Sequence, residues 1–155
     1  IKKMEGVILA AIGAGLAVGL PGLGSAIGSG LAGASASGVI AEKKQEFVTG
    51  LIFEALPQTA VIFGFVIAIM IVGLINDPVK GGLGMSVLDG AKMLGAGLAM
   101  GIAGLTPIGQ GPAAAAGIGS TARSPATKVN NIVYTAIPDL SVIMGFVIAF
   151  MLISA

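Results

Sequence analysis

The sequence contains no cysteine and no histidine. Their absence excludes disulfide bonds, thiolate or imidazole metal sites, and catalysis by a Ser-His or Cys-His pair. Charged residues make up only 10% of the chain, against about 25% in a typical soluble domain. The formal net charge of +1 gives no reason to expect a nucleic-acid partner. Hydrophobic residues, in contrast, reach 55%, more than a soluble core can hide, so the expected solvent is the lipid bilayer.

Four apolar segments are separated by short charged stretches, at about residues 5–41, 47–76, 86–121 and 129–154. Each is longer than the roughly 20 residues that cross a bilayer as an α-helix. The first also exceeds the roughly 7–15 apolar residues of a signal peptide, so we expect a membrane span there. The sequence therefore predicts an all-α, multi-pass membrane protein with four transmembrane helices and both termini on one side.

The chain repeats itself at a constant offset of 81 residues. The run ALPQTAVIFGFVIA at 55–68 matches AIPDLSVIMGFVIA at 136–149, and AIGSG at 26–30 matches PIGQG at 107–111. A unit with an even number of spans repeats without inverting, unlike the inverted repeats of many secondary transporters. We therefore predict two tandem helical hairpins, residues 1–76 and 77–155.

The odd and even spans differ in composition. Spans one and three are rich in glycine and alanine, whereas spans two and four are rich in isoleucine, valine, phenylalanine and methionine. Small residues four apart let helices approach closely, and such pairs occur at Gly15/Gly19, Gly24/Gly28 and Gly97/Gly101. Slender helices suit an inner circle and bulky ones a lipid-facing circumference. The pattern suggests a two-layered ring of several copies, with an ordinary four-helix bundle as the open alternative.

Asp139 lies inside the fourth apolar segment. A charged aspartate at the bilayer centre costs about 2.5–3.5 kcal/mol on insertion scales, so an acid there is a candidate functional residue. It is tolerated if it faces other helices, binds a cation or carries a proton. Pro138 and its repeat counterpart Pro57 free backbone carbonyls, which are suitable cation ligands. A packing kink explains either proline equally well, and Asp139 could also be a polar contact between helices.

Other polar residues could complete a site. Gln58 occupies the position that matches Asp139, so the two hairpins together carry one acid at this position. Gln58, Thr59 and Gln110 could turn oxygens toward Asp139, although for Thr59 and Gln110 a hydrogen bond between helices is an open alternative. Glu54 shares a helix face with Gln58 and is a candidate second working acid, or else a partner for a basic residue near the surface.

These features resemble the proteolipid, also called the K or c subunit, of V-type and A-type rotary ATPases in its duplicated four-helix form. The resemblance covers essentially the whole chain. It rests on the glycine-rich odd spans, the segments LPQT at 56–59 and IPD at 137–139 with their shared GFVIA tails, and IGQG at 108–111.

The resemblance implies a homo-oligomeric rotor ring in a bacterial or archaeal plasma membrane. Its partners would be the lipid bilayer, a stator membrane subunit and central-stalk subunits, with no nucleic acid. The chain would hold no tightly bound cofactor and catalyse no bond chemistry. It would carry H⁺ or Na⁺ in a rotation coupled to ATP hydrolysis or synthesis.

Transferred to this sequence, the resemblance makes Asp139 the ion-binding carboxylate. Thr59 and Gln110 fall on side-chain ligand positions of the sodium-binding members, and Leu56 on a position that supplies a backbone carbonyl.

Two positions depart from the sodium-binding members. Ala60 stands where they have a second glutamine, and Phe63 where they have a tyrosine that hydrogen-bonds the carboxylate. Water or Gln58 could complete a Na⁺ site at Asp139, so both H⁺ and Na⁺ remain open.

A small four-span, proton-coupled transporter is the alternative function. A drug-binding pocket is expected to have aromatic walls, yet aromatic residues make up 5% of the chain and tryptophan is absent. A helical scaffold without transport is a third reading.

Overall fold

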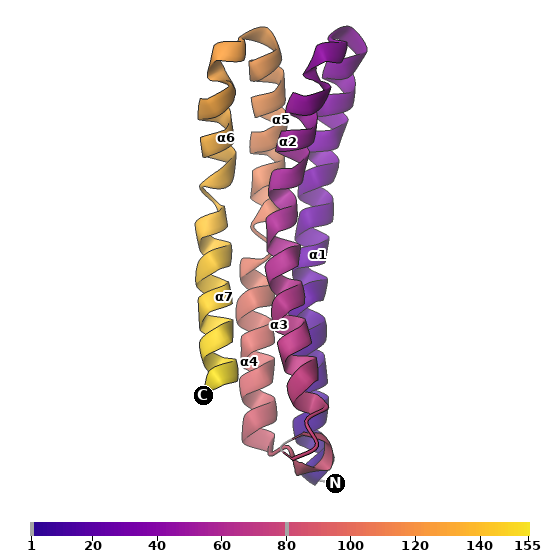
Figure 1. Cartoon of the computed structure of the whole chain (residues 1–155), viewed down its shortest axis with the longest axis vertical. Helices are drawn as coiled ribbons and strands as arrows, with labels where there is room; N and C mark the ends of the chain where they lie inside the picture. Colours follow the sequence, from indigo (N-terminus) through magenta and orange to yellow (C-terminus); the bar gives the residue numbers. More distant parts are fainter. Residues whose placement is uncertain (1, 80) are drawn as a thin grey trace.

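The computed structural model describes residues 2–79 and 81–155, and these are almost entirely helical (Figure 1). The helices are α1 (Lys2–Glu42), α2 (Phe47–Ala55), α3 (Thr59–Ile75), α4 (Val87–Ala103), α5 (Pro107–Arg123), α6 (Lys128–Ala136) and α7 (Asp139–Ser154). Short 3₁₀ turns occur at Lys44–Glu46, Leu56–Gln58, Gly82–Gly84 and Pro125–Thr127.

Four helical stretches of the described residues are long and apolar enough to cross a membrane: Met4–Glu42, Lys44–Ile75, Val87–Arg123 and Pro125–Ser154. Both termini lie toward one end of the molecule, and the α1–α2 and α5–α6 turns lie at the other (Figure 1). The predicted all-α fold with four transmembrane helices is therefore confirmed.

The glycines of spans one and three let their backbones touch. The first span, α1, packs along its length against α4 and α5. A Cβ atom on Gly97 would collide with the backbone of Gly13, and one on Gly111 would lie 2.8 Å from the Gly28 Cα atom. No side chain larger than hydrogen fits at such approaches without a shift of the backbone, so the glycines set the distance between these two spans.

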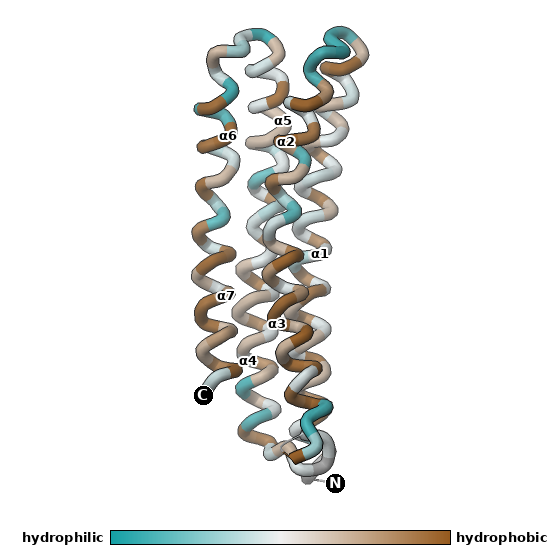
Figure 2. The backbone as a smooth tube through the Cα atoms, viewed as in Figure 1, coloured by the Kyte–Doolittle hydropathy of each residue, from teal (hydrophilic) through white to brown (hydrophobic). Residues whose placement is uncertain are grey.

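The bulky spans pack on the outside of this pair. The second span, α2 and α3, lies against α1, while α6 and α7 lie against α5 and α4. The two bulky spans also meet, and the rings of Phe63 and Phe146 lie with their centroids 5.1 Å apart. Figure 2 shows strongly hydrophobic colouring along α3 and α7 and paler colouring along α1. Only 11% of the most apolar window of the fourth span is buried, as expected for a helix that faces lipid.

Two of the glycines expected to pack do not do so within the chain. Gly15 and Gly19 lie on an exposed face of α1, where a Cβ atom would meet nothing within 4 Å. Gly13, Gly24 and Gly28 face the third span instead. A helix turns by 100° per residue, so Gly15 lies about 180° around the helix from Gly24 and cannot share its contact.

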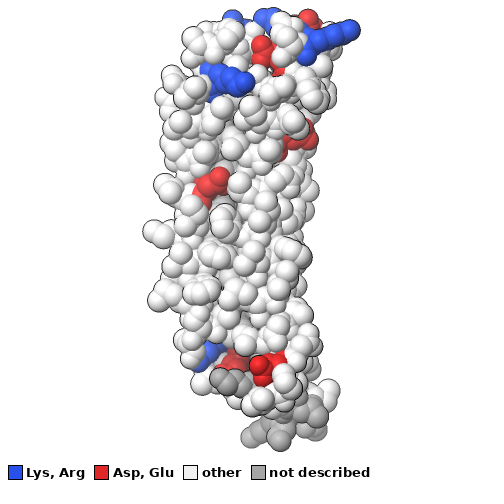
Figure 3. Space-filling view, viewed as in Figure 1, with Lys and Arg blue, Asp and Glu red and all other residues white. Residues whose placement is uncertain are grey.

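Charged side chains gather at the two ends of the molecule (Figure 3). The broad belt between the ends is uncharged apart from isolated acidic groups. At the end formed by the α1–α2 and α5–α6 turns, Lys43 donates a hydrogen bond from Nζ to the carbonyl of Ala122. This contact ties the first interhelical turn to the end of α5.

Candidate ion-binding site

Three of the four spans are interrupted where they approach one another. The second span breaks between α2 and α3, the third between α4 and α5, and the fourth between α6 and α7. Prolines account for these breaks, because proline has no N–H and disrupts the preceding helical turn; they are Pro57, Pro107 and Pro138. Each break exposes the carbonyl end of one helix and the N–H end of the next, and both ends can interact with ions.

The carboxylate of Asp139 connects the three interrupted spans. Its Oδ1 atom accepts hydrogen bonds from Thr59 Oγ1 at 3.1 Å and from Gln110 Nε2 at 2.8 Å. Thr59 is the first residue of α3, Gln110 lies in the first turn of α5, and Asp139 begins α7. Asp139 and Thr59 are half-buried, whereas Gln110 is fully buried. The structure thus brings together three of the residues that the sequence singled out.

Gln110 holds the centre of this group. Besides Asp139, its Nε2 atom donates to the backbone carbonyl of Thr135 at 3.1 Å. Its Oε1 atom is buried and has no hydrogen-bond partner among the described residues. A buried amide oxygen without a partner costs free energy, and it is a natural ligand for a cation that enters the site.

Leu56 contributes through its backbone. The Leu56 carbonyl oxygen lies 3.1 Å from Thr59 Oγ1, whose single hydrogen is shared between this carbonyl and Asp139 Oδ1. The hydroxyl of Thr59 therefore lies between the Leu56 carbonyl and the Asp139 carboxylate, so three oxygen atoms of different kinds lie close together.

Gln58 and Glu54 do not join this group. The amide of Gln58 donates from Nε2 to Ser29 Oγ at 2.9 Å, and among the described residues no hydrogen bond joins it to Asp139. Glu54 lies one helical turn before Gln58, half-buried beside Gly33. It forms no hydrogen bond or ion pair within the described part of the chain.

Ser29 is a contact that the residue-by-residue reading missed. The signal was present, because the 81-residue offset that matches Gln58 with Asp139 also matches Ser29 with Gln110. Each hairpin therefore joins its two spans by a hydrogen bond at the same place, Gln58–Ser29 in one and Asp139–Gln110 in the other. The carbonyl of Thr135 was also missed, and a backbone acceptor leaves no signal in a sequence.

The chemistry available at Asp139 is that of one carboxylate with neutral oxygens. Among the residues that the structure describes, no three acidic side chains lie together in a group that could hold a metal ion. A single negative charge is balanced by one proton or one monovalent cation. The two positions that depart from the sodium-binding pattern add no side-chain oxygen, because alanine and phenylalanine contain none. Ala60 is fully buried, and the ring of Phe63 packs on that of Phe146.

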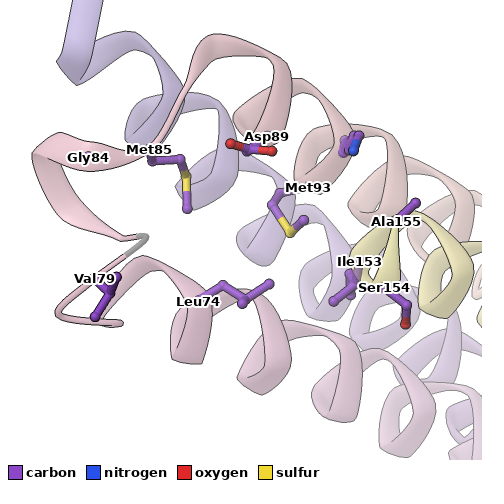
Figure 4. A pocket seen from close by; sticks show the side chains of 10 residues that line it. Leu74, Val79, Gly84, Met85, Asp89, Met93, Ile153, Ser154 and Ala155 are labelled. Atoms are coloured by element: carbon purple, nitrogen blue, oxygen red, sulfur yellow. The ribbon is translucent and has the colours of Figure 1, made fainter.

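A cavity lies at another place in the molecule. It has a volume of about 400 Å³ and is found near the termini, between the end of α3, the start of α4 and the end of α7 (Figure 4). Leu74, Met85, Met93 and Ile153 line it together with Asp89. None of the residues around Asp139 reaches this cavity, so it is separate from the site.

Comparison with known proteins agrees with this organisation. The family of the ATP synthase C subunit matches twice, over residues 12–71 and 94–152. The chain is 42% identical over 150 residues to the A-type ATP synthase subunit K of Methanocaldococcus jannaschii, covering 97% of this chain and 64% of that protein. It is 36% identical over 155 residues to the V-type sodium ATPase subunit K of Enterococcus hirae, covering 99% of this chain and 95% of that protein.

The chain thus spans less than two thirds of the archaeal relative and nearly the full length of the bacterial one. The two family matches fall on the two hairpins that the internal repeat predicts. From the doubled match, the four spans and the two relatives, we conclude that this chain belongs to the ATP synthase C-subunit family, as a duplicated, four-helix proteolipid of the subunit K type.

Proposed function

We propose that the chain is a rotor-ring subunit of a V/A-type ATPase or ATP synthase and carries H⁺ or Na⁺ through the membrane on Asp139. The observation that supports this best is the convergence of Asp139, Gln110 and Thr59 from three spans inside the apolar belt. The names of the two relatives, an ATP synthase subunit and a sodium ATPase subunit, point to the same function.

The proposed cycle follows from the charge of one carboxyl group. With a cation or proton bound, Asp139 is neutral overall and can face lipid. When empty it is an anion, which the hydrocarbon rejects, so it must stay beside a fixed cationic group on a stator subunit. This asymmetry converts ion flow into rotation in one direction. The membrane supplies about 2.3 kcal/mol per charge per 100 mV, so several ions must pass for each ATP.

The proposal gives one working site per chain. The counterparts of Asp139, Gln110 and Thr59 at the 81-residue offset are Gln58, Ser29 and Leu140. All three differences reduce the capacity to hold a cation. An amide replaces the acid, a short hydroxyl replaces the long amide, and a hydrocarbon replaces the hydroxyl. The first hairpin therefore retains the hydrogen bond between its spans and lacks the charge.

For the ion itself, we propose Asp139, Gln110, Thr59 and the Leu56 carbonyl as the binding groups, with Gln58 outside the direct contacts. The spare Oε1 atom of Gln110 supports a Na⁺ ligand role. The lack of side-chain oxygens at positions 60 and 63 supports the proton as the transported ion. Carbodiimide labelling with and without Na⁺ separates the two ions.

The remaining partners follow from the same proposal. The ring would form from copies of this chain, turn against a stator membrane subunit and connect to central-stalk subunits. The chain would act without bond chemistry of its own and without a tightly bound cofactor. We also propose residues 1–76 and 77–155 as its two structural units, which the positions of the two family matches support.

The test uses dicyclohexylcarbodiimide, which modifies carboxyl groups in apolar surroundings, on membranes that contain the whole complex. We expect labelling of Asp139 and loss of coupled ATPase activity, with Glu42→Gln, a change of an exposed acid at the end of α1, as a control that leaves both unchanged. Protection by Na⁺ near neutral pH identifies sodium as the ion, and dependence on pH alone identifies the proton. Full ion transport by Asp139→Asn would refute the proposal.

Imaging of the detergent-extracted protein separates the rotor from a small proton-coupled transporter. A rotor subunit forms a closed circle of copies, whereas a four-span transporter is expected as a monomer or a small oligomer.

A further inference from the structure

An open groove runs between α1 and α2, in the half of the molecule nearer the α1–α2 turn. Its volume is about 380 Å³. Its walls include Ala36, Ser37 and Ile40 from α1 and Phe47, Leu51 and Glu54 from α2. The polar side chains among its lining residues are those of Ser37 and Glu54. Glu54 has no hydrogen-bond or ion-pair partner within the described chain, although an unpaired charge in a membrane span is costly.

The second hairpin has the corresponding groove between α5 and α6, and there it is filled. The ring of Phe53, from α2 of the first hairpin, covers Gly117; a Cβ atom on that glycine would lie 2.7 Å from Phe53 Cε1. Phe53 and Ile118 belong to one buried cluster, and both are 0% exposed. The first hairpin thus closes the groove of the second with one aromatic side chain.

The internal repeat tells which residue would close the open groove. The helices α2 and α6 have the same length and correspond at the 81-residue offset. Under this offset Gly117 corresponds to Ala36, Ile118 to Ser37, and Phe53 to Tyr134. Tyr134 is 65% exposed, whereas Phe53 is 0% exposed. The chain therefore has an exposed aromatic side chain, Tyr134, at the position that corresponds to the one that fills the α5–α6 groove. It also has the open α1–α2 groove, in which no aromatic side chain takes this place.

These two features lie on opposite sides of the molecule, with α6 at one edge and α1 at the other (Figure 1). Tyr134 therefore cannot reach the groove of its own chain. A second copy, placed by repeating the relation between the two hairpins, would bring its Tyr134 to the groove. Such a head-to-tail contact uses two different surfaces and generates a ring when the rotation closes.

The chemistry of the residue suits the groove. Tyr134 is the only tyrosine of the chain, and a buried tyrosine hydroxyl usually finds a hydrogen-bond partner. Its counterpart Phe53 has no hydroxyl and needs no such partner. The residue of the second hairpin that matches Glu54 is Thr135, which already donates to the Asn131 carbonyl. The α1–α2 groove, into which Tyr134 would fit, thus also contains the carboxylate of Glu54, which has no partner within the described chain.

We infer that Tyr134 of one copy inserts into the α1–α2 groove of the next copy and donates its hydroxyl hydrogen to Glu54. This inference rests on the proposed ring and adds to it a contact surface and a role for the second acid. Glu54 then serves assembly, as a hydrogen-bond acceptor between copies, and does not carry the transported ion.

Cross-linking tests the contact, and the absence of cysteine from the chain removes any background. The full chain carries Tyr134→Cys and Ser37→Cys and is treated in membranes with a short bis-methanethiosulfonate reagent. We expect a ladder of dimers and larger species on a denaturing gel. The matched pair Phe53→Cys and Ile118→Cys should cross-link within one chain and remain monomeric. Tyr134→Cys with Gly15→Cys serves as the distant control.

The outcomes separate the inference from the proposed ring. A wild-type protein that shows no oligomer on a native gel would remove the ring itself. Oligomers that persist, while the Tyr134/Ser37 pair gives no more ladder than the Tyr134/Gly15 pair, would overturn only the inference.

Unmodified protein offers a second measurement, because Tyr134 alone supplies the intrinsic fluorescence of a chain without tryptophan. We expect acrylamide to quench it several-fold less in the oligomer than in the dissociated chain. Equal quenching would contradict insertion.

The Glu54 contact has its own test, with the variants Tyr134→Phe and Glu54→Gln. A hydrogen bond to a charged group corresponds to about ten-fold or more in association. Each variant should therefore weaken oligomer association by about that factor, and the double variant no more than the weaker-binding single one, because paired residues are not additive. Fully additive losses would show that Glu54 is not the acceptor.

Discussion

Thr59 and Asp139 are 80 residues apart in sequence, yet Thr59 Oγ1 donates to Asp139 Oδ1 at 3.1 Å. One residue belongs to the first hairpin and the other to the second. The candidate site is therefore shared between the two halves of the chain, and neither hairpin alone contains it.

This relationship leads to the first prediction. Thr59→Val keeps the shape of the side chain and removes the hydroxyl. A hydrogen bond to a charged group contributes about 1.5–3 kcal/mol. If Na⁺ is the ion, the concentration that half-protects Asp139 from carbodiimide should rise about ten-fold or more. Thr59→Ser keeps the hydroxyl and should remain close to wild type. Equal protection of the Val and Ser variants would show that the hydroxyl plays no part.

The second prediction concerns Gln110 and its counterpart Ser29. Gln110→Leu removes the donor to Asp139 and to the Thr135 carbonyl. Loss of partners for buried polar groups costs about 1–3 kcal/mol each, so ion uptake into vesicles should fall at least ten-fold. Ser29→Ala removes the matching contact of the first hairpin. Because this contact lies outside the ion site, its loss should have an effect as small as that of a typical surface substitution. Ion uptake should stay within two-fold of wild type. A similar loss in both variants would mean that Gln110 acts only in packing.

Restoring a site in the first hairpin is the third prediction, tested in an Asp139→Asn background. Gln58→Asp alone should not recover ATP-driven ion uptake, because Ser29 offers no amide where the working site has Gln110, and Leu140 offers no hydroxyl where it has Thr59. Adding Ser29→Gln and Leu140→Thr supplies these groups and should recover measurable uptake. Recovery by Gln58→Asp alone would show that a carboxylate suffices without neighbours.

The fourth prediction compares two glycines. Gly97→Ala places a methyl group against the backbone of Gly13, and overpacking of this kind costs typically about 1–3 kcal/mol. The thermal unfolding midpoint of the detergent-solubilised monomer should fall. Gly15→Ala meets open space and replaces a poor helix former with a good one, so stability should be unchanged or rise by up to about 1 kcal/mol. A lower midpoint for Gly15→Ala than for Gly97→Ala would contradict this packing of the first and third spans.

Several features of this protein follow from its composition and from the local order of its residues. The length of the apolar segments requires four membrane helices, the 81-residue offset reveals the two hairpins, and the cost of a charge in hydrocarbon marks Asp139. Prolines 57 and 138 predict breaks in the second and fourth spans because the proline ring acts on its own neighbours. All of these follow from interactions within a few residues or from the bilayer.

Which residues meet as partners depends instead on how the helices pack in three dimensions. Gln58 and Thr59 are adjacent, yet a turn of 100° between them sends one to Ser29 and the other to Asp139. Gly13 and Gly15 are alike in sequence, yet one meets Met93 of the facing helix and the other meets nothing. Phe53 is buried and its counterpart Tyr134 is exposed, because the first hairpin has a neighbour within the chain on that side and the second does not. Contacts of this kind depend on the rotation and depth of packed helices, which residues far apart in the sequence fix together.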